Sequence, residues 1–388
     1  MKSLRITRVA AVAAAALVVA ALAACSSTQS SSPAGSTTSG GSIKIALIDP
    51  LTGTAAQYGQ DLHQGQTLAI KQLNAAGGVL GKKFQAVEYD DQNLPAQGVT
   101  VTQRAISQDG VKFVVGTNGS SVALAIRNVT EKAKVIYIVG SSKGPTITDA
   151  QHHFVFRVNT SVDQDAGYFY PYVDKTLHPK KLAIIQEQSD SGQGLTAGIQ
   201  AHFKDRALAP VITQLTTTDF GPFISKIQAQ DPDAVFLADS GSTTAEAASV
   251  QQMKESGLDV PKVLGPGSVS AALLKLVGNG LDGAVTADVY APSMDNKLNT
   301  AFVAAYRKAY KVDPSVQAEL GYEQVTSLAA AIAKAKAAED TTKVAAALRS
   351  ITFNTPRGTV TFDAQGQAVP KNGLIPLTVK NGKEVPVK

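Results

Sequence analysis

Two pairs of serine residues stand directly after apolar stretches of the sequence. Ser120 and Ser121 follow one such stretch, and Ser141 and Ser142 follow the next. Hydroxyl groups and backbone N–H groups at the start of a helix bind anionic groups such as carboxylates. The same hydroxyl groups can instead cap the helix that follows or belong to a turn. The pattern favours non-covalent binding of a small anion, with the structural roles left open.

Covalent and metal chemistry lack the residue patterns that they require. A nucleophilic serine needs a base and an orienting group, and the second serine pair does not form a Ser-x-x-Lys signature with Lys143. Gly-Pro-Gly at 265–267 lacks the last glycine of a dinucleotide fingerprint. The histidines show no metal-binding spacing; they are His63, His152, His153, His178 and His202. We therefore predict a protein that is not an enzyme and holds no metal or cofactor.

Apolar runs alternate with helical patterns along two stretches that open alike, Lys-Ile-Ala-Leu-Ile at 44–48 and Lys-Leu-Ala-Ile-Ile at 181–185. The predicted strands are 43–48, 84–89, 112–115 and 135–139, then 181–185, 211–215, 234–238, 262–265 and 284–289. Strands separated by helices form right-handed βαβ units with a parallel sheet. We therefore predict an α/β protein with two doubly wound lobes, followed by helices and two short strands at 359–362 and 377–379 that pack back onto the lobes.

Ligands of open α/β sheets bind beyond the carboxyl ends of the strands. Two facing lobes would bring the loops at those ends to one cleft. These loops are 49–59, 116–121, 140–145, 187–194, 239–244 and 265–270, and they are rich in Gly, Ser and Thr.

The first 42 residues are typical of a leader and a tether. Lys2, Arg5 and Arg8 precede an unbroken apolar run at 9–24, which predicts a signal peptide. Leu-Ala-Ala-Cys at 22–25 ends the run and resembles the lipobox of bacterial lipoproteins, which implies that Cys25, the one cysteine of the 388 residues, is acylated. Of the next 17 residues, 14 are Ser, Thr or Gly, a composition that predicts a flexible coil.

The net charge of +5 depends largely on that leader. Without Lys2, Arg5 and Arg8 the chain has 33 basic and 31 acidic residues, a net charge of +2. No run of five basic residues occurs in the remaining chain. Nucleic acid is therefore not an expected partner.

Short motifs follow one another along about residues 43–380. They include Pro-Leu-Thr-Gly at 50–53, Ala-Gln-Tyr-Gly at 56–59, Asn-Ala-Ala-Gly-Gly-Val-Leu-Gly at 74–81, Tyr-Asp-Asp at 89–91 and Phe-Val-Phe-Arg at 154–157. Together they resemble the leucine/isoleucine/valine-type periplasmic binding proteins of ABC importers, in their lipoprotein form. The resemblance implies two lobes joined by three crossovers that close on a small ligand.

The resemblance also implies roles for individual residues. Ser120 matches a residue whose hydroxyl and backbone hold the ligand carboxylate, and Ser141 matches one that offers its backbone. Tyr58 matches an aromatic near the pocket, although it can equally be a packing residue. Ser121 and Ser142 are candidates as their neighbours.

Four positions depart from the family pattern. Lys143 stands where the family has a ligand-binding threonine. Two family aromatics align approximately with Ser191 and Ser240, and the family acid that holds a ligand ammonium aligns near Gly267. A buried ammonium requires a partner, so Asp190 and Asp239 are candidates to replace that acid. Lys143 is a candidate to pair with a second acidic group of the ligand. The alternatives are that the aspartates cap helices and that the lysine is solvated.

The predicted organisation is a signal peptide at 1–24, a lipidated cysteine and tether at 25–42, lobe I at 43–158 plus 289–367, and lobe II at 159–288 plus 368–388. We predict an extracytoplasmic monomer, lipid-anchored to the bacterial cell membrane, that delivers an amino acid or a related small carboxylate solute to ABC permease and ATPase subunits. The alternative is a ligand-sensing receptor component that signals through a separate partner chain.

Overall fold

The computed structural model describes residues 41–238 and 242–387, and residues 40–388 form one compact unit. The predicted signal peptide, Cys25, almost all of the tether and Asp239 lie outside the described residues. No helix among the described residues is long and apolar enough to cross a membrane.

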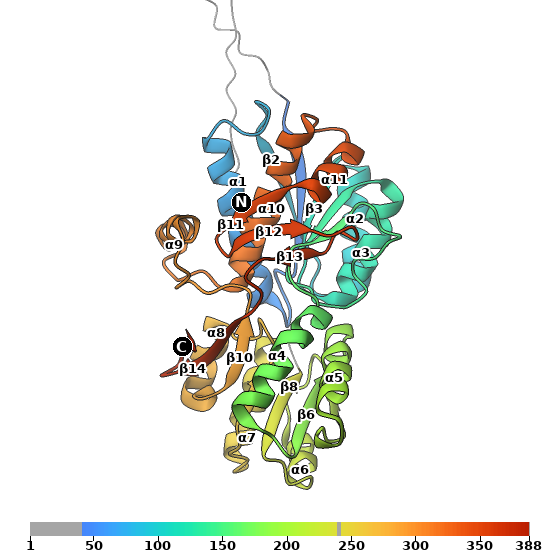
Figure 1. Ribbon diagram of the computed structural model, residues 1–388. Coiled ribbons are helices and arrows are strands. Elements are labelled where there is room, and N and C mark those ends of the chain that lie inside the picture. Colours follow the sequence, from blue (N-terminus) through green and yellow to red (C-terminus); the bar gives the residue numbers. More distant parts are fainter. Residues whose placement is uncertain (1–40, 239–241, 388) are drawn as a thin grey trace, which may run out of the picture. The chain divides into compact units, whose positions relative to one another are not determined.

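The first sheet has five strands, all parallel, and lies in one half of the unit (Figure 1). Its strands are, in spatial order, β2 (Phe84–Asp90), β1 (Ile43–Asp49), β3 (Phe113–Gly116), β4 (Ile136–Val139) and β5 (Val155–Arg157). The helices between them are α1 (Ala56–Ala75), α2 (Pro95–Ser107) and α3 (Ser120–Ala133). We call this sheet and the helices packed on it the five-stranded half.

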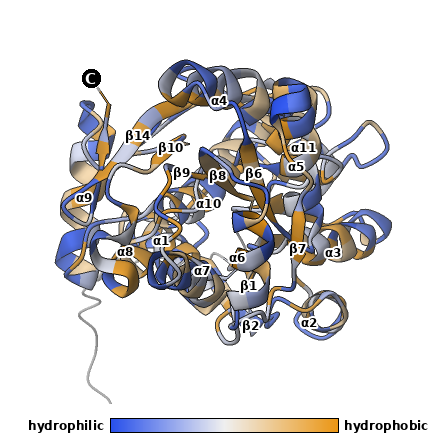
Figure 2. Ribbon diagram, turned by 90° about the horizontal axis from the view of Figure 1, so that it is seen from below, coloured by the Kyte–Doolittle hydropathy of each residue, from blue (hydrophilic) through white to orange (hydrophobic). Residues whose placement is uncertain are grey.

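Alternate residues of β1 are buried on opposite faces of this sheet. Ile45 and Leu47 belong to a core cluster that includes residues of α1, whereas Ala46 and Ile48 belong to a cluster with residues of α2 and α3. The run of consecutive apolar residues in β1 therefore reflects burial on both faces, as expected for a parallel sheet covered by helices. Figure 2 shows hydrophobic colouring on the strands and more hydrophilic colouring on the surrounding helices.

The second sheet has seven strands and forms, with its helices, the seven-stranded half (Figure 1). Its strands are β15 (Lys383–Pro386), β14 (Ile375–Lys380), β10 (Val285–Asp288), β9 (Lys262–Leu264), β8 (Ala234–Ala238), β6 (Leu182–Glu187) and β7 (Val211–Thr213). Its helices are α4 (Val162–Leu177), α5 (Asp190–Phe203), α6 (Gly221–Gln228), α7 (Thr243–Glu255) and α8 (Ala271–Val277), with 3-10 turns at Lys204–Arg206 and Gly278–Leu281. Serine hydroxyls accept the N-terminal backbone N–H groups of several of these helices, as preferred at N-caps; they are Ser161, Ser189, Ser242 and Ser270.

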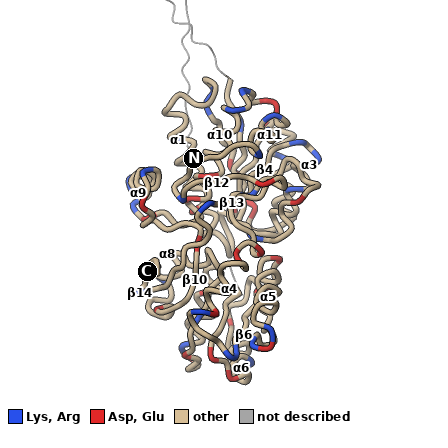
Figure 3. The backbone as a smooth tube through the Cα atoms, viewed as in Figure 1, with Lys and Arg blue, Asp and Glu red and all other residues tan. Residues whose placement is uncertain are grey.

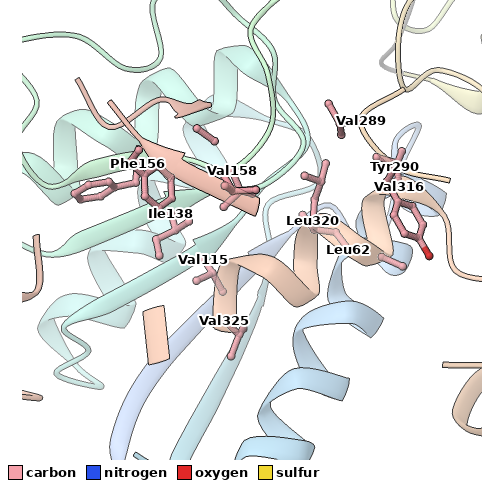
Figure 4. Packing of buried hydrophobic residues seen from close by; sticks show 14 of the residues in the cluster. Leu62, Val115, Ile138, Phe156, Val158, Val289, Tyr290, Val316, Leu320 and Val325 are labelled. Atoms are coloured by element: carbon pink, nitrogen blue, oxygen red, sulfur yellow. The ribbon is translucent and has the colours of Figure 1, made fainter. Parts of the chain in front are cut away.

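The C-terminal part returns to the five-stranded half before it ends in the seven-stranded sheet. It comprises α9 (Lys297–Tyr310), α10 (Val316–Ala335) and α11 (Thr341–Ser350), then a three-stranded sheet of β11 (Thr352–Thr355), β12 (Gly358–Phe362) and β13 (Ala368–Pro370). Figure 4 shows Leu320 of α10 in a common core with Leu62 of α1 and with Val115 and Ile138 of the first sheet.

The chain thus passes between the two halves three times. The passages follow β5, β10 and β13, because the next sheet strand or packed helix belongs to the other half each time. This confirms the predicted class of two α/β lobes with three crossovers. The exact lobe boundaries stay a prediction.

Three local features differ from the sequence expectation. No element is predicted between the strands at 135–139 and 181–185, where the structure has β5 and then α4 with Pro171 inside it. The second sheet is not purely parallel, because β14 pairs antiparallel with β10 and β15 pairs antiparallel with β14. The strand at 359–362 is one of three in a small separate sheet. All three features depend on contacts between distant segments or on capping, which outweigh local propensity.

Helices α1 and α10 approach closely at two glycines. A Cβ on Gly65 would lie 1.9 Å from the carbonyl oxygen of Ala318, and a Cβ on Gly321 would lie 2.0 Å from that of Leu62. Neither backbone can yield without separating the two helices, so glycine is required at both positions.

We expect Gly65→Ala to lower the free energy of unfolding by about 2–3 kcal/mol, because the added methyl group meets the backbone of α10. Urea denaturation measures the change. Gly167→Ala is the matched control, since Gly167 is an exposed residue of α4 with nothing near its Cβ position. It should raise stability by about 0.5–1 kcal/mol. Equal effects of the two substitutions would contradict the close packing of α1 on α10.

Candidate functional site

A cavity of about 240 Å³ lies where strand ends of the two sheets meet. Four segments of the five-stranded half and of α10 line it, and they contribute Asn93–Pro95, Asn118–Val122, Ser141 with Lys143, and Gln317. The seven-stranded half and the chain leading to it contribute Asn159, Glu187, Ser189, Ser191, Leu215, Pro266 and Gly267. The volume is below the usual range for drug-sized ligands and suits one small solute.

Ser120 and Ser121 open helix α3 at one wall of this cavity. The N-cap residue Gly119 has no side chain to satisfy the first N–H groups of α3, so the positive end of the helix remains directed at the cavity. The Ser120 hydroxyl accepts the N–H of Gly144 at 3.0 Å, and its own proton remains available to a second acceptor. This wall can therefore bind a carboxylate.

Ser141 also lines the cavity, whereas Ser142 does not. The Ser141 hydroxyl donates to Asn118 Oδ1 at 2.7 Å, its backbone N–H donates to the carbonyl oxygen of Thr117 at 3.3 Å, and its carbonyl oxygen accepts from the Asn159 amide at 3.0 Å. The backbone contact with a ligand expected for Ser141 stays a prediction. Ser142 is buried, and its hydroxyl donates to the carbonyl oxygen of Asn118 at 2.8 Å. The geometry indicates that Ser142 holds the loop in place. A direct contact between Ser142 and a ligand stays a prediction.

Lys143 lines the cavity, but its charge is already compensated by the protein. Its Nζ donates to Asp165 Oδ2 at 2.5 Å and to Thr160 Oγ1 at 3.2 Å, and the side chain is buried. The added Cβ of a residue at Gly267 would lie 3.7 Å from Lys143 Cε and 3.9 Å from the carboxylate oxygens of Asp288. Lys143 thus adjoins the position at which the family pattern has an acid.

Asp288 completes this group of buried charges. Burial raises the pKa of the Asp288 carboxyl to about 7, and the nearby charge of Lys143 offsets part of that increase. Lys143 therefore lies among acidic side chains that come from other elements than its own loop. The lysine is not the solvated residue of the alternative interpretation.

Tyr58 does not line the cavity and instead connects the two halves. Its hydroxyl, on α1, lies 2.7 Å from Glu246 Oε2 and 2.9 Å from the carbonyl oxygen of Ser268. Burial raises the pKa of Glu246 well above its usual value, and the charge of Glu187 contributes to the increase. A protonated Glu246 can donate to the Tyr58 oxygen while Tyr58 donates to Ser268. Glu246 Oε1 is buried and has no hydrogen-bond partner among the described residues.

Asp190 also contacts the opposite half and does not line the cavity. Its Oδ2 accepts a hydrogen bond from the Ser121 hydroxyl at 3.0 Å. Asp190 is the first residue of α5, where a negative charge is favourable. The role predicted for Asp190, replacing the family acid, stays a prediction.

The acid that does line the cavity is Glu187, which was not among the predicted site residues. It is the last residue of β6 and only 3% exposed. The signal was present in the sequence, because Glu187 begins the predicted cleft loop at 187–194. In the same loop, Ser191 is buried, and its Oγ has no hydrogen-bond partner among the described residues.

No group of three His, Cys, Asp or Glu residues in the described ranges could hold a metal ion. Figure 3 shows Lys and Arg interspersed with Asp and Glu over both halves. The electrostatics of the cavity are therefore set by the few charges beside it and not by one basic or acidic face. The arrangement suits recognition of a small polar solute.

Comparison with known proteins agrees with this geometry. The family model described as periplasmic binding protein matches residues 42–383. The leucine-, isoleucine-, valine-, threonine- and alanine-binding protein of Pseudomonas aeruginosa is 32% identical over 330 residues, 84% of this chain and 87% of that protein. The similarity thus extends over almost the whole unit that the structure describes.

Two solved structures share the fold. A leucine-binding protein from Thermotoga maritima has a TM-score of 0.82 and 25% identity, and covers 89% of this chain and 98% of its own. An ABC transporter solute-binding protein from R. palustris, in complex with benzoate, has a TM-score of 0.82 and 24% identity, with 89% and 95% covered. The chain belongs to the periplasmic binding protein family and has the type I fold of the leucine/isoleucine/valine-type solute-binding proteins of ABC importers.

Proposed function

We propose that this protein is an extracytoplasmic, lipid-anchored solute-binding protein that delivers an amino acid or a related small carboxylate solute to an ABC importer. The observation that carries the proposal is the cavity, which both halves line and which receives the start of α3 without a side-chain cap. The similarity to amino-acid-binding proteins supports the solute class.

The proposed mechanism is binding followed by closure, without a covalent step. The solute carboxylate binds the N–H groups of the first turn of α3 and the Ser120 hydroxyl. Contacts with the opposite wall then favour the closed arrangement, since a ligand shifts a conformational equilibrium only by its differential affinity for the two forms. We propose that lobe I (43–158 plus 289–367) and lobe II (159–288 plus 368–388) move as two bodies in this step, and that the closed monomer docks on the permease.

Direct hydrogen bonds between the halves would stabilise the closed form. Tyr58 binds Glu246 and Ser268, Ser121 binds Asp190, and the Gln317 amide donates to the carbonyl oxygen of Gly267 at 3.1 Å. Tyr58 is the most buried of these links. We infer that Tyr58 acts in closure and not as a direct ligand contact.

We expect Ser120→Ala to weaken binding of the solute by about 1–3 kcal/mol, because a buried carboxylate loses one hydrogen bond. A thermal-shift screen with L-leucine, L-isoleucine, L-valine, L-threonine, L-alanine and benzoate first identifies the solute. Isothermal titration calorimetry then compares the variants. Ser225→Ala, an exposed serine of α6, is the matched control and should leave the dissociation constant unchanged. An unchanged constant for Ser120→Ala would remove Ser120 from the site.

We expect Tyr58→Phe to raise the dissociation constant about 5- to 100-fold, because the closed form loses both hydrogen bonds of the Tyr58 hydroxyl, each worth about 0.5–1.5 kcal/mol. Tyr168→Phe is the matched control, since Tyr168 is an exposed residue of α4. The same calorimetric titration measures both variants. If Tyr58→Phe and Tyr168→Phe bind alike, the proposed role of Tyr58 in closure is wrong.

Lipid attachment is proposed at Cys25, which lies outside the described residues. Because the chain has one cysteine, labelling is unambiguous. In a bacterial host fed an alkyne-labelled fatty acid, the wild-type protein should take up label and sediment with membranes. Cys25→Ala should remain unlabelled and leave the membrane fraction. Label that persists on Cys25→Ala, or a wild-type protein without label, would contradict the anchor.

A further inference from the structure

We propose that Lys143 is a positioning residue for closure, whose ion pair with Asp165 crosses between the two halves and compensates the carboxylates that closure buries. The proposal rests on the function proposed above and concerns how the protein closes, not which solute it binds. It gives Lys143 a role different from the contact with an acidic group of the solute that the sequence suggests.

The ion pair joins elements of different halves. Lys143 lies in the loop after β4, whereas Asp165 lies in the first turn of α4, in the seven-stranded half. The Lys143 Nζ is 2.5 Å from Asp165 Oδ2 and 3.2 Å from the Oγ1 of Thr160, a residue of the passage between the halves. The N–H of Val162, at the start of α4, donates to the carbonyl oxygen of Lys143 at 3.1 Å. One residue therefore holds α4 through both its backbone and its side chain.

The Lys143 side chain also lies beside two strand ends of the seven-stranded sheet. A Cβ on Gly267, in the loop after β9, would lie 3.7 Å from Lys143 Cε. The same Cβ would lie 3.9 Å from both carboxylate oxygens of Asp288, the last residue of β10. Separation of the halves would withdraw the ammonium from these strand ends and expose it to water.

Two buried carboxylates depend on this ammonium. Asp165 and Asp288 are each only 2% exposed, and Asp165 Oδ1 has no hydrogen-bond partner among the described residues. Burial raises the pKa of Asp288, and the charge of Lys143 opposes that rise. A buried charge whose partner is removed is strongly destabilising. The closed form therefore requires Lys143 as long as these carboxylates are present.

The buried guanidinium groups of this region bind other acceptors. Arg157 donates to Gln367 Oε1 at 2.6 Å, and Arg357 donates to both oxygens of Glu323. Both arginines keep their partners when the lysine is replaced. Lys143 is therefore the cation that compensates the carboxylates on α4 and at the end of β10.

The first measurement reports closure directly. Spin labels at Ser107→Cys and Ser225→Cys, in a Cys25→Ala background, place one label at the exposed end of α2 and one on the exposed face of α6. Pulsed electron–electron double resonance gives the distance distribution between the halves. The amino acid that stabilises the wild-type protein most in the thermal-shift screen is added at saturation.

We expect the solute to shift the wild-type distribution to shorter distances. Lys143→Met should keep a larger fraction of longer distances at the same saturation, because closure would bury carboxylates without their cation. Lys254→Met, at an exposed lysine of α7, is the matched control and should match the wild type. Thermal unfolding of each variant shows that it is folded, and Lys143→Gln takes the place of Lys143→Met if that variant does not fold.

Calorimetric titration of the same variants gives a double-mutant cycle. We expect Lys143→Met to weaken solute binding at least about 10-fold. Asp165→Asn should weaken it less, because Asp288 remains beside the ammonium. The double variant should bind at least about 3-fold more tightly than the product of the two single effects gives, because it removes both members of the pair.

Three results would overturn the assignment of Lys143. They are an unchanged dissociation constant in Lys143→Met, weaker binding with an unchanged distance distribution, and strictly multiplicative effects of the two substitutions. The second result indicates a direct contact of Lys143 with the solute. In each case a solute that still depends on Ser120 retains the proposed function. If no solute of the screen shortens the wild-type distance, the proposed function fails, and this inference fails with it.

Discussion

The buried guanidinium of Arg357 holds together the segments on which the geometry of the cavity depends. It donates to both oxygens of Glu323 on α10, at 2.6 and 2.7 Å, and to the carbonyl oxygen of Val158 at 2.6 Å. The Gln367 amide similarly donates to the carbonyl oxygen of Asn159 at 2.7 Å. A buried ion pair gains little net stability because both charges lose hydration. The buried ion pair does require its partners to keep one geometry. Here that geometry holds the segment after β5, at Val158, against α10, where the chain passes between the halves.

This constraint explains why one cavity combines residues distant in sequence. The passages after β5 and before β14 set how the carboxyl ends of the two parallel sheets approach each other. The start of α3 then supplies N–H groups from one half, and the end of β6 supplies a carboxylate from the other. Tyr58 connects the same two halves without lining the cavity. In the proposed mechanism, recognition and closure therefore depend on different side chains around one framework.

Much of this arrangement was predictable from residue patterns, because strand alternation and the rule for α/β sheets locate the loops at a shared cleft. Ser120, Ser141 and Lys143 line the cavity as that rule implies. The sequence could not predict which acidic residue of loop 187–194 lines the cavity, because the loop contains both Glu187 and Asp190 and the sequence does not give side-chain directions. Tyr58 likewise contacts a helix 188 residues away along the chain. Helix α4 and the three-stranded sheet depend on capping and on long-range pairing, which a local pattern does not reveal.

The central claim is that a small solute binds between the start of α3 and the end of β6. A crystal structure of the wild-type protein grown with the amino acid that stabilises it most tests this claim directly. The account predicts solute density in the cavity, with the carboxylate within hydrogen-bond distance of the Ser120 hydroxyl and of the first N–H groups of α3. Solute density elsewhere, or a solute in the cavity whose carboxylate does not contact α3, would contradict it.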